Sequence, residues 1–447
     1  MVSAILIITI VLVAALLANY SFFEKEATVY VGVTYCGDSV EGGKMLIDKV
    51  KHYTNLFVLQ SGLLQRNLTS VNELGEYAVS AGLHFLPYFG YYIAASFFPW
   101  LETAKQKWGT RFLGVYYGDE PGGKMLDDYV EFKNTTTGDS IMKTRYGDVV
   151  LEKSNGVVVH YEINGAIHLS LPDSNQNLNS TETGGYATFY PNGTIKIDTP
   201  YTSTDLPSYA NYEDLLSMRP LKDVNEAADK FTTRDQYNIE YLSNSTTVFT
   251  SDYGLYWFNY LSGYDVILEH IGWNHTVAQH IALTRGAAKL QNKTWGIVIT
   301  WKYNTPPYLD NGTEILSQMR TAYECGAKYF VFFNYYEDNG NPYGTMKDEH
   351  FKALESFWKG VVKNPNVVHG SIKADSVLVL PENYGWGMRW ATDKIWGIFK
   401  ADNQTLQLWD LMQSTLNAHN LTADIVYEDA NFPLAPEYQH IYYWNQK

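Results

Sequence analysis

Eight short apolar runs recur along the chain, and most are followed by a stretch with the apolar spacing of a helix. Strands buried on both faces read as unbroken apolar runs, and strands that alternate with helices form parallel sheets. Eight such units predict an α/β fold, a closed (β/α)8 TIM barrel whose chemistry lies where the strands end. The predicted strands are Thr28–Tyr35, Asn55–Gln60, His84–Phe89, Phe112–Tyr117, Thr247–Ser251, Val266–Leu268, Gly296–Thr300 and Tyr329–Phe333.

The apolar spacing also predicts the helices around this barrel, which we place at residues 28–362. Three helices follow the early strands, at Gly43–Tyr53, Val71–Ala81 and Trp100–Trp108. Residues 221–242 are helical in pattern and return the chain to the barrel after a long interruption. Lys347–Val361 carries its large apolar residues on one stripe and is expected to close the barrel.

Residues 124–220 interrupt the strand–helix alternation after the fourth strand. Three Asn-Gly pairs separate alternating or β-branched runs there, and Asn-Gly between such runs is a strong hairpin signal. We predict an antiparallel β insertion on the active face of the barrel, either shaping the substrate groove or serving only as a solubilising decoration. The predicted strands are Asp148–Lys153, Val157–Ile163, Ala166–Leu171, Tyr186–Tyr190 and Thr194–Asp198.

Residues 367–447 form a third region, a small α/β module. Ser376–Pro381 and Ala423–Glu428 are predicted as strands on either side of an amphipathic helix at Gln404–His419, with a further strand at His440–Trp444. This unit is too small to fold alone and is expected to pack on the barrel.

Residues 1–23 form an N-terminal leader with a nearly unbroken apolar run from Ala4 to Ala18. We interpret it as a membrane anchor or a cleaved signal peptide. Ten Asn-x-Ser/Thr triplets are consistent with glycosylation, although a chain rich in Asn and Thr also forms them by chance. We therefore predict an extracellular or cell-surface glycoprotein, either secreted or membrane-anchored. The triplets begin at Asn67, Asn134, Asn179, Asn192, Asn244, Asn274, Asn292, Asn311, Asn403 and Asn420.

The two cysteines are predicted to remain free thiols even in an exported protein. Cys36 ends the first strand, whereas Cys325 precedes the eighth strand, so the two lie at opposite ends of the barrel. That separation is about a strand length, roughly 20 Å, and a disulfide needs Cα atoms within about 7 Å.

Composition narrows the class of function. The net charge of −15 argues against nucleic-acid binding, because no basic surface is available for phosphates. Aromatic residues make up 15% of the chain, and flat aromatic faces suit both sugar rings and a large core. The sequence has no zinc-type His spacing, no phosphate-cradling Gly-rich loop and no Gly-x-Ser-x-Gly elbow, so we expect no metal and no cofactor.

Carboxylates at the predicted strand ends are the candidate catalytic groups. Glycoside cleavage uses two of them, one to protonate the leaving oxygen and one to attack or to activate water. Glu120, in Gly-Asp-Glu-Pro after the fourth strand, is the predicted general acid/base. Glu269 is the predicted nucleophile or base, with Glu337 as its replacement. The structural alternatives are a solvated turn pair for Asp119 and Glu120, and a buried salt bridge for Glu269.

Other polar and aromatic residues at the same strand ends are predicted to contact a carbohydrate substrate. Asp38 has an alternative role as a helix cap after the first strand. The predicted substrate-binding residues are Asp38, Asp119, Asp252, Trp273, Trp301, Lys302, Tyr303, Asn334 and Tyr336.

With these residues the chain resembles barrel glycoside hydrolases. Gly-Asp-Glu-Pro at 118–121 is similar to the Asn-Glu-Pro that carries the acid/base in a large clan of retaining barrel enzymes. Asp119 stands where that clan has Asn, and Trp301-Lys302 stands where it has the nucleophilic Glu. Acids after strands four and six are instead similar to α-galactosidase-like barrels, although those use Asp. The C-terminal module resembles the α/β module of some microbial β-galactosidases.

The resemblance implies a glycoside hydrolase that acts on extracellular or cell-surface glycans. The alternative is a non-catalytic carbohydrate-binding protein on a degenerate barrel, which the departure at the seventh strand keeps open. Two facing acids would favour the enzyme, at about 5–5.5 Å for retention or about 6.5–9.5 Å for inversion.

Overall fold

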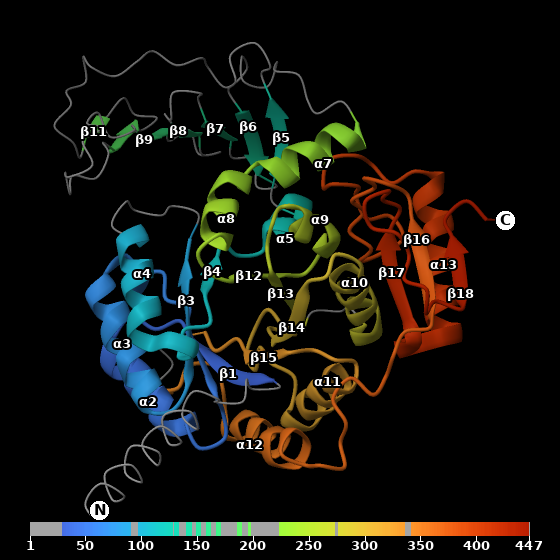
Figure 1. Ribbon diagram of the computed structural model, residues 1–447. Helices are drawn as coiled ribbons and strands as arrows, with labels where there is room; N and C mark the ends of the chain where they lie inside the picture. Colours follow the sequence, from blue (N-terminus) through green and yellow to red (C-terminus); the bar gives the residue numbers. More distant parts are fainter. Residues whose placement is uncertain are drawn as a thin grey trace, which may run out of the picture.

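The computed structural model describes residues 29–90, 97–127, 129–133, 140–144, 149–152, 158–161, 167–170, 186–189, 195–197, 223–272, 276–335 and 341–446. Eight parallel strands close into a barrel in the order β1-β2-β3-β4-β12-β13-β14-β15 (Figure 1). The predicted (β/α)8 barrel is confirmed, and each strand overlaps its predicted run. The strands are β1 (Tyr30–Tyr35), β2 (Leu56–Leu59), β3 (His84–Phe89), β4 (Val115–Tyr117), β12 (Val248–Asp252), β13 (Val266–Ile271), β14 (Thr294–Ile299) and β15 (Tyr329–Phe332).

Helices surround the barrel, and polar side chains cap many of them. Ser39, Asn67 and Asn311 each accept a backbone N–H in the first turn of the helix that follows, which satisfies a donor with no partner inside the helix. The helices are α2 (Val40–Val50), α3 (Leu68–Ser80), α4 (Phe97–Trp108), α5 (Pro121–Asp127), α7 (Val224–Thr233), α8 (Gln236–Ser243), α9 (Tyr256–Leu261), α10 (Val277–Leu290), α11 (Gly312–Glu324) and α12 (Asp348–Phe357), with a π-helical turn at Trp358–Val362.

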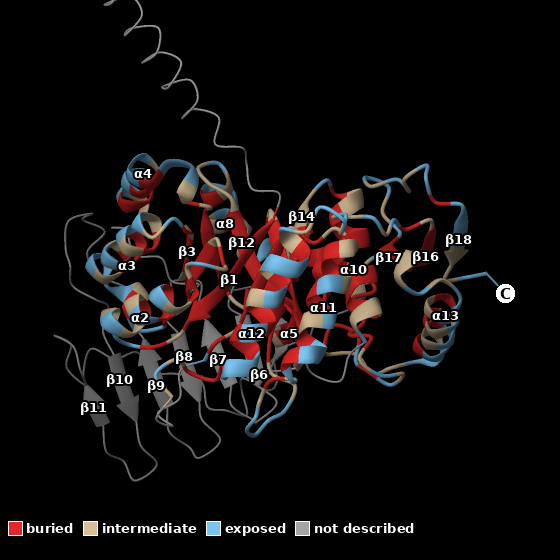
Figure 2. Cartoon of the chain, turned by 90° about the horizontal axis from the view of Figure 1, so that it is seen from below, coloured by how far each residue is buried: buried red, intermediate tan, exposed pale blue. Residues whose placement is uncertain are grey.

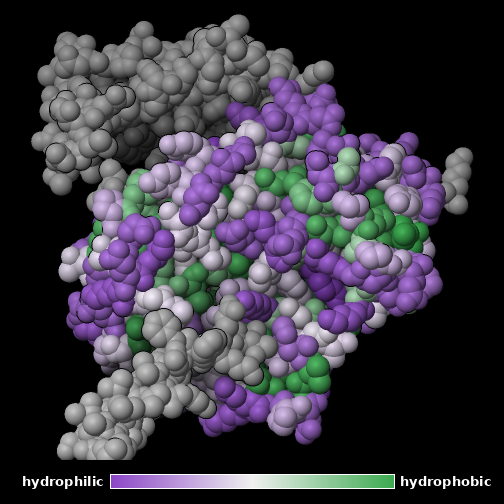
Figure 3. All heavy atoms as spheres, in the orientation of Figure 1, coloured by the Kyte–Doolittle hydropathy of each residue, from purple (hydrophilic) through white to green (hydrophobic). Residues whose placement is uncertain are grey.

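The core has two parts because barrel strands bury both of their faces. Inside the barrel, Leu56, Val58, Leu268 and Val331 belong to one compact apolar cluster. A larger cluster fills the space between the strands and the helices. Figure 2 shows buried residues along the strands and on the inner sides of the helices, with exposed residues on the outer sides. Figure 3 shows hydrophilic residues over much of the described surface, with smaller hydrophobic areas between them.

The predicted antiparallel insertion is confirmed and contains more strands than the Asn-Gly pairs indicated. It leaves the barrel after α5 and forms a seven-stranded sheet in the order β11-β10-β9-β8-β7-β6-β5. The first two strands lie before the first Asn-Gly pair and were not predicted. The strands are β5 (Tyr129–Lys133), β6 (Ser140–Thr144), β7 (Val149–Glu152), β8 (Val158–Tyr161), β9 (Ile167–Ser170), β10 (Tyr186–Phe189) and β11 (Ile195–Ile197).

The C-terminal module is a three-stranded parallel sheet in the order β17-β16-β18 with one long helix. Its elements are β16 (Ser376–Leu380), α13 (Asn403–His419), β17 (Ala423–Tyr427) and β18 (His440–Tyr443). The module packs on α10 of the barrel (Figure 1), where a Cβ added to Gly286 would lie 2.9 Å from the carbonyl oxygen of Ile425.

Cys36 and Cys325 are both free, as predicted. No helix in the described part of the chain is both long and apolar enough to cross a lipid bilayer. The predicted leader at 1–23 lies outside the described residues. Of the ten Asn-x-Ser/Thr triplets, six begin in the described regions, and in all six the asparagine is exposed. These residues are Asn67, Asn244, Asn292, Asn311, Asn403 and Asn420.

Candidate functional site

The direction of each side chain at the strand ends decides which residues meet. Successive side chains of a strand point to opposite faces, and residues paired across parallel strands share a face. Asp252 pairs with Glu269 across β12 and β13. Both carboxyl groups point out of the barrel, whereas Ser251 and His270 point into it and line an internal cavity.

This cavity lies inside the barrel at the carboxyl ends of the strands and has a volume of about 30 Å³. That is room for about two water molecules, at roughly 10–15 Å³ each. Polar and apolar side chains both line the cavity, so it can hold a polar group beside apolar contacts. The lining residues are Thr34, Val58, Gln60, Tyr116, Asp119, Glu120, Ser251, Leu268, His270, Val298, Thr300, Val331 and Phe333.

Glu120 is fixed by its own backbone at the edge of this cavity. Its φ is +53°, a left-handed conformation that costs a non-glycine residue about 1–3 kcal/mol and that occurs preferentially at functional sites. The backbone N–H of Glu120 donates to the Ser251 carbonyl at 2.9 Å, and its carbonyl accepts from Lys124 N–H at 2.9 Å. Pro121 then begins α5 with φ already suited to a helix. The side chain of Glu120 remains 29% exposed, so solvent and ligands can reach it.

Asp252 holds this turn in place from outside the barrel. Its fully buried carboxylate accepts five N–H donors: the backbone N–H of Gly122 (2.6 Å), Gly123 (2.7 Å), Tyr253 (2.7 Å) and Gly254 (3.3 Å), and Nδ2 of Asn259 (2.6 Å). Burial raises the pKa of Asp252 to about 6, although the hydrogen bonds from Asn259, Gly122, Gly123 and Tyr253 favour the ionised form. The side chain of Asp252 faces the helices, and these contacts give it a structural role in place of the predicted sugar contact.

Four polar groups inside the barrel form a hydrogen-bonded chain. The hydroxyl groups of Tyr116 and Ser251 both donate to Oδ1 of Asp119, the latter at 3.0 Å. Ser251 Oγ also lies 2.8 Å from His270 Nε2. The Tyr116 hydroxyl also lies 2.7 Å from Ser251 Oγ, so Tyr116, Asp119, Ser251 and His270 form one continuous network.

This network reaches Glu120 through His270. Nδ1 of His270 lies 3.5 Å from Oε1 of Glu120, while Nε2 of the same ring contacts Ser251. The geometry therefore places an imidazole beside an accessible carboxyl group at the mouth of the barrel.

Glu269 is not brought together with Glu120. It is fully buried between β13 and α10, and neither of its oxygens has a hydrogen-bond partner among the described residues. Burial raises the pKa of Glu269 to about 8, while the nearby Thr284 hydroxyl and Arg285 guanidinium act in the opposite direction. The predicted pairing of Glu120 with Glu269 fails because the odd–even alternation of β13 turns Glu269 outward and His270 inward.

Asn334 also has a structural role in place of the predicted sugar contact. It is buried, its N–H donates to Thr34 Oγ1 at 2.9 Å, and its side-chain oxygen accepts from Met346 N–H at 3.1 Å. Trp301 packs in an aromatic cluster with Tyr308, Phe333 and Tyr335 beyond the ends of β14 and β15. Because Phe333 lines the cavity, this cluster lies at the rim of the mouth.

The remaining predicted residues are spread more widely. Asp38 is exposed after β1, and Ser39, one residue later, is the cap of α2. The backbone N–H groups of Lys302 and Tyr303 both donate to the Tyr308 carbonyl, and Tyr303 is 47% exposed. Of the predicted set, Asp119 and Glu120 line the cavity. Trp273, Tyr336 and Glu337 lie outside the described residues.

Sequence reasoning did not single out the inward partners of Glu120, which are Tyr116, Ser251 and His270. Their signal was the alternation along each strand: His270 lies two residues after inward Leu268, and Ser251 lies one before outward Asp252. No cluster of three or more His, Cys, Asp or Glu side chains suited to a metal ion occurs within the parts of the chain that the structure describes.

No protein-family model matches the chain, and no curated protein does. The chain is similar to the solved structure of a GH5_18 protein from Streptomyces cattleya in complex with Manb1-4GlcNAc, with 9% identity, 93% of this chain and 99% of that chain covered, and a TM-score of 0.49. A second structure of GH5_18 from that organism, with GlcNAc, has 11% identity, coverage of 94% and 99%, and a TM-score of 0.47. An O-GlcNAc hydrolase from Thermobaculum terrenum has 11% identity, coverage of 74% and 59%, and a TM-score of 0.31.

Proposed function

We propose that this protein is a glycoside hydrolase that acts on extracellular or cell-surface glycans, with Glu120 as its general acid/base. The observation that carries this proposal is the contact of 3.5 Å between Glu120 Oε1 and His270 Nδ1 at the mouth of a closed barrel, which places an imidazole beside an accessible carboxyl group. Glycoside cleavage requires a protonated carboxyl group next to the leaving oxygen.

Glu337 is the carboxylate that we propose as the partner of Glu120. It follows β15 by five residues, and the carboxyl ends of all barrel strands open onto the same face. Asp119 is the neighbour of Glu120, but it already accepts hydrogen bonds from Tyr116 and Ser251 and is better suited to orienting His270. The separation of the Glu120 and Glu337 carboxyl groups then sets the stereochemical outcome.

A second candidate function is carbohydrate binding without cleavage. It is favoured by β14, the seventh barrel strand, which leads into Trp301 and Lys302 and carries no acid at its end. In this case the aromatic cluster at the rim would bind sugars and the Glu120–His270 pair would be a remnant of an active site.

The test is turnover of aryl glycosides and polysaccharides by the native protein and by Glu120→Gln. Glutamine keeps the size and hydrogen bonding of the side chain but has no acidic proton, so turnover should fall by about 10²–10⁴-fold. Glu102→Gln is the matched control, because that carboxylate is exposed on α4. Full activity of Glu120→Gln would overturn the assignment, and oligosaccharide binding with no turnover of any substrate would favour the second candidate.

We further propose that the protein lies outside the cytoplasm, tethered or secreted by means of residues 1–23. The exposure of all six described sequon asparagines supports glycosylation, since a transferase must reach them. Protease treatment of intact cells should digest a tethered form, and a secreted form should appear in the medium with added glycan mass. Complete protection together with an unglycosylated cytosolic form would contradict the proposal.

A further inference from the structure

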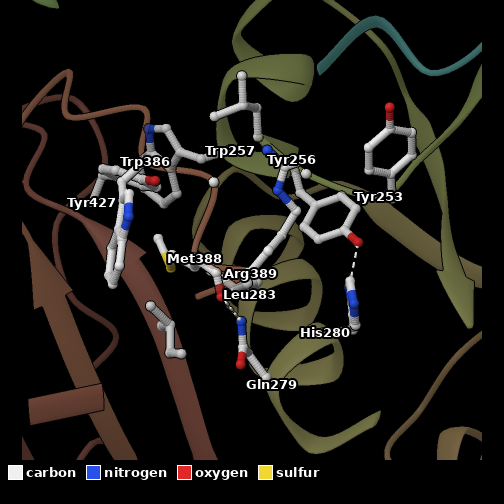
Figure 4. A pocket seen from close by; sticks show the side chains of 14 residues that line it. Tyr253, Tyr256, Trp257, Gln279, His280, Leu283, Trp386, Met388, Arg389 and Tyr427 are labelled. Atoms are coloured by element: carbon white, nitrogen blue, oxygen red, sulfur yellow. Dashed lines mark hydrogen bonds between the residues drawn. The ribbon is translucent and has the colours of Figure 1, made fainter. Parts of the chain in front are cut away.

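A loop of the C-terminal module reaches the rim of the barrel mouth. Residues 382–400 connect β16 to α13, and Gln279 of α10 donates to the Met388 carbonyl at 2.7 Å (Figure 4). The next residue, Arg389, forms an ion pair with Asp127 at the end of α5, the helix that begins directly after Glu120. Tyr253 donates to the same Asp127 at 3.0 Å, and its ring lies 5.8 Å from that of His270.

This loop is held rigidly in a strained conformation. Asn383, Met388 and Trp396 all have φ between +56° and +57°, a left-handed conformation that costs about 1–3 kcal/mol at each non-glycine residue. Buried Trp386 and Trp396 anchor the loop, the latter against Phe258 at a ring distance of 4.6 Å. Strain that is held in place by its surroundings is characteristic of ligand-binding segments.

The loop presents one large aromatic face to solvent. Trp390 is 50% exposed, the only exposed tryptophan among the described residues. The Arg389 guanidinium lies over its ring at 4.7 Å. That guanidinium donates hydrogen bonds to both carboxylate oxygens of Asp393, at 2.7 and 2.8 Å. The Arg389 side chain is therefore fixed against the indole of Trp390.

We propose that Trp390 forms a sugar-stacking subsite at the rim of the barrel mouth. The C–H groups of a pyranose ring make favourable dispersion contacts with a flat aromatic face. Contacts through Tyr253, Asp127 and Arg389 link Trp390 to His270, so we expect Trp390 to meet a different sugar unit from the one at Glu120. This inference rests on the proposed glycosidase function and specifies its substrate as an oligosaccharide or polysaccharide.

The experiment compares Trp390→Ala with the native protein on aryl monosaccharides and on tetrasaccharides of glucose, mannose and N-acetylglucosamine. For a cleaved tetrasaccharide, KM should rise about tenfold or more with kcat little changed, because the lost contact is equally strong in ground and transition states. The aryl monosaccharides should be cleaved as before. Trp390→Phe should keep KM for the tetrasaccharide close to the native value, because it retains an aromatic face. Leu406 is an exposed apolar residue on α13, and Leu406→Ala should leave KM unchanged.

Calorimetric binding of the same tetrasaccharides to Glu120→Gln separates this proposal from the proposed function. If nothing is cleaved, loss of binding in the double variant with Trp390→Ala still supports the subsite. If tetrasaccharides bind the double variant as tightly as the parent, or bind neither, the subsite is wrong. An equal KM increase for aryl monosaccharides would also contradict it.

Discussion

At the scale of single residues, Glu269 is an ionisable group in a place where ionisation is unfavourable. Its folded-state pKa of about 8 lies above the ordinary 4.5, so its contribution to stability is fully present below pH 4.5 and is lost as the pH rises through 8. Each pH unit between these values lowers the free energy of unfolding by up to about 1.4 kcal/mol.

Glu269→Gln should therefore raise the free energy of unfolding at pH 8 and change it little at pH 5. Glutamine has nearly the same shape but cannot ionise. Urea denaturation at pH 5, 6.5 and 8 measures how steeply the free energy of unfolding falls with pH. This slope should be smaller in the variant. Glu102→Gln serves as an exposed control. A variant that is less stable than the native protein at pH 8 would show that the charged form of Glu269 is the favourable one.

His270 supports a second prediction at this scale. His270→Asn keeps a polar group near Ser251 but removes the imidazole beside Glu120. We expect kcat/KM to fall about 10–100-fold, because the ring no longer positions the Glu120 carboxyl group. Asp119, Tyr116 and Tyr253 also face this pair and are unchanged in the variant. An unchanged kcat/KM would contradict this role of His270, and His52→Asn, at an exposed position, is the control.

These two residues also show where sequence reasoning reaches its limit. Val266, Ile267 and Leu268 are all apolar because β13 is buried on both faces, so the run does not reveal which residues point inward. An acid at its end was expected to face the mouth, but Glu269 points outward and His270 inward. The sequence located the fourth strand end correctly because Pro121 fixes the turn after Glu120, whatever the direction of the preceding strand.

At the scale of elements, apolar runs and Asn-Gly pairs were sufficient to predict the barrel, the insertion and the module. A buried parallel strand is visible as a short apolar run regardless of its neighbours. β5 and β6 were not predicted, because no Asn-Gly pair flanks Tyr129–Lys133 or Ser140–Thr144. The loop that places Trp390 at the rim was also not predicted, since its position depends on Gln279 and Asp127, which are distant in sequence.

The contact between α5 and β12 supports a prediction at the same scale. Asp252→Ala removes a buried carboxylate and leaves five N–H donors without their acceptor. Such losses typically cost about 3–5 kcal/mol, and we expect a loss of that order in the free energy of unfolding. Asp252→Asn should cost less, because it retains one acceptor oxygen. Urea denaturation measures both variants, and a loss below about 1 kcal/mol in the alanine variant would contradict a structural role for Asp252.

At the scale of the whole molecule, a buried ion pair joins the C-terminal module to the barrel. Arg285 of α10 donates from Nε to Asp424 of β17 at 2.7 Å, and its Nη2 donates to the carbonyls of Leu421 and Ala423. Tyr438 donates to the second Asp424 oxygen at 2.7 Å. Both charged side chains are more than 90% buried, so water cannot replace the contacts between them unless the interface opens.

Removing one partner leaves an uncompensated buried charge, so Asp424→Leu alone and Arg285→Met alone should each lower the free energy of unfolding by about 3–5 kcal/mol. The double variant should lose clearly less than the sum, because two apolar side chains of similar volume can pack where the pair was. Urea denaturation followed by two spectroscopic probes measures this cycle and also tests whether the transitions of the module and the barrel separate in the single variants. If the effects of the two substitutions simply add, the Arg285–Asp424 pair does not couple the module to the barrel.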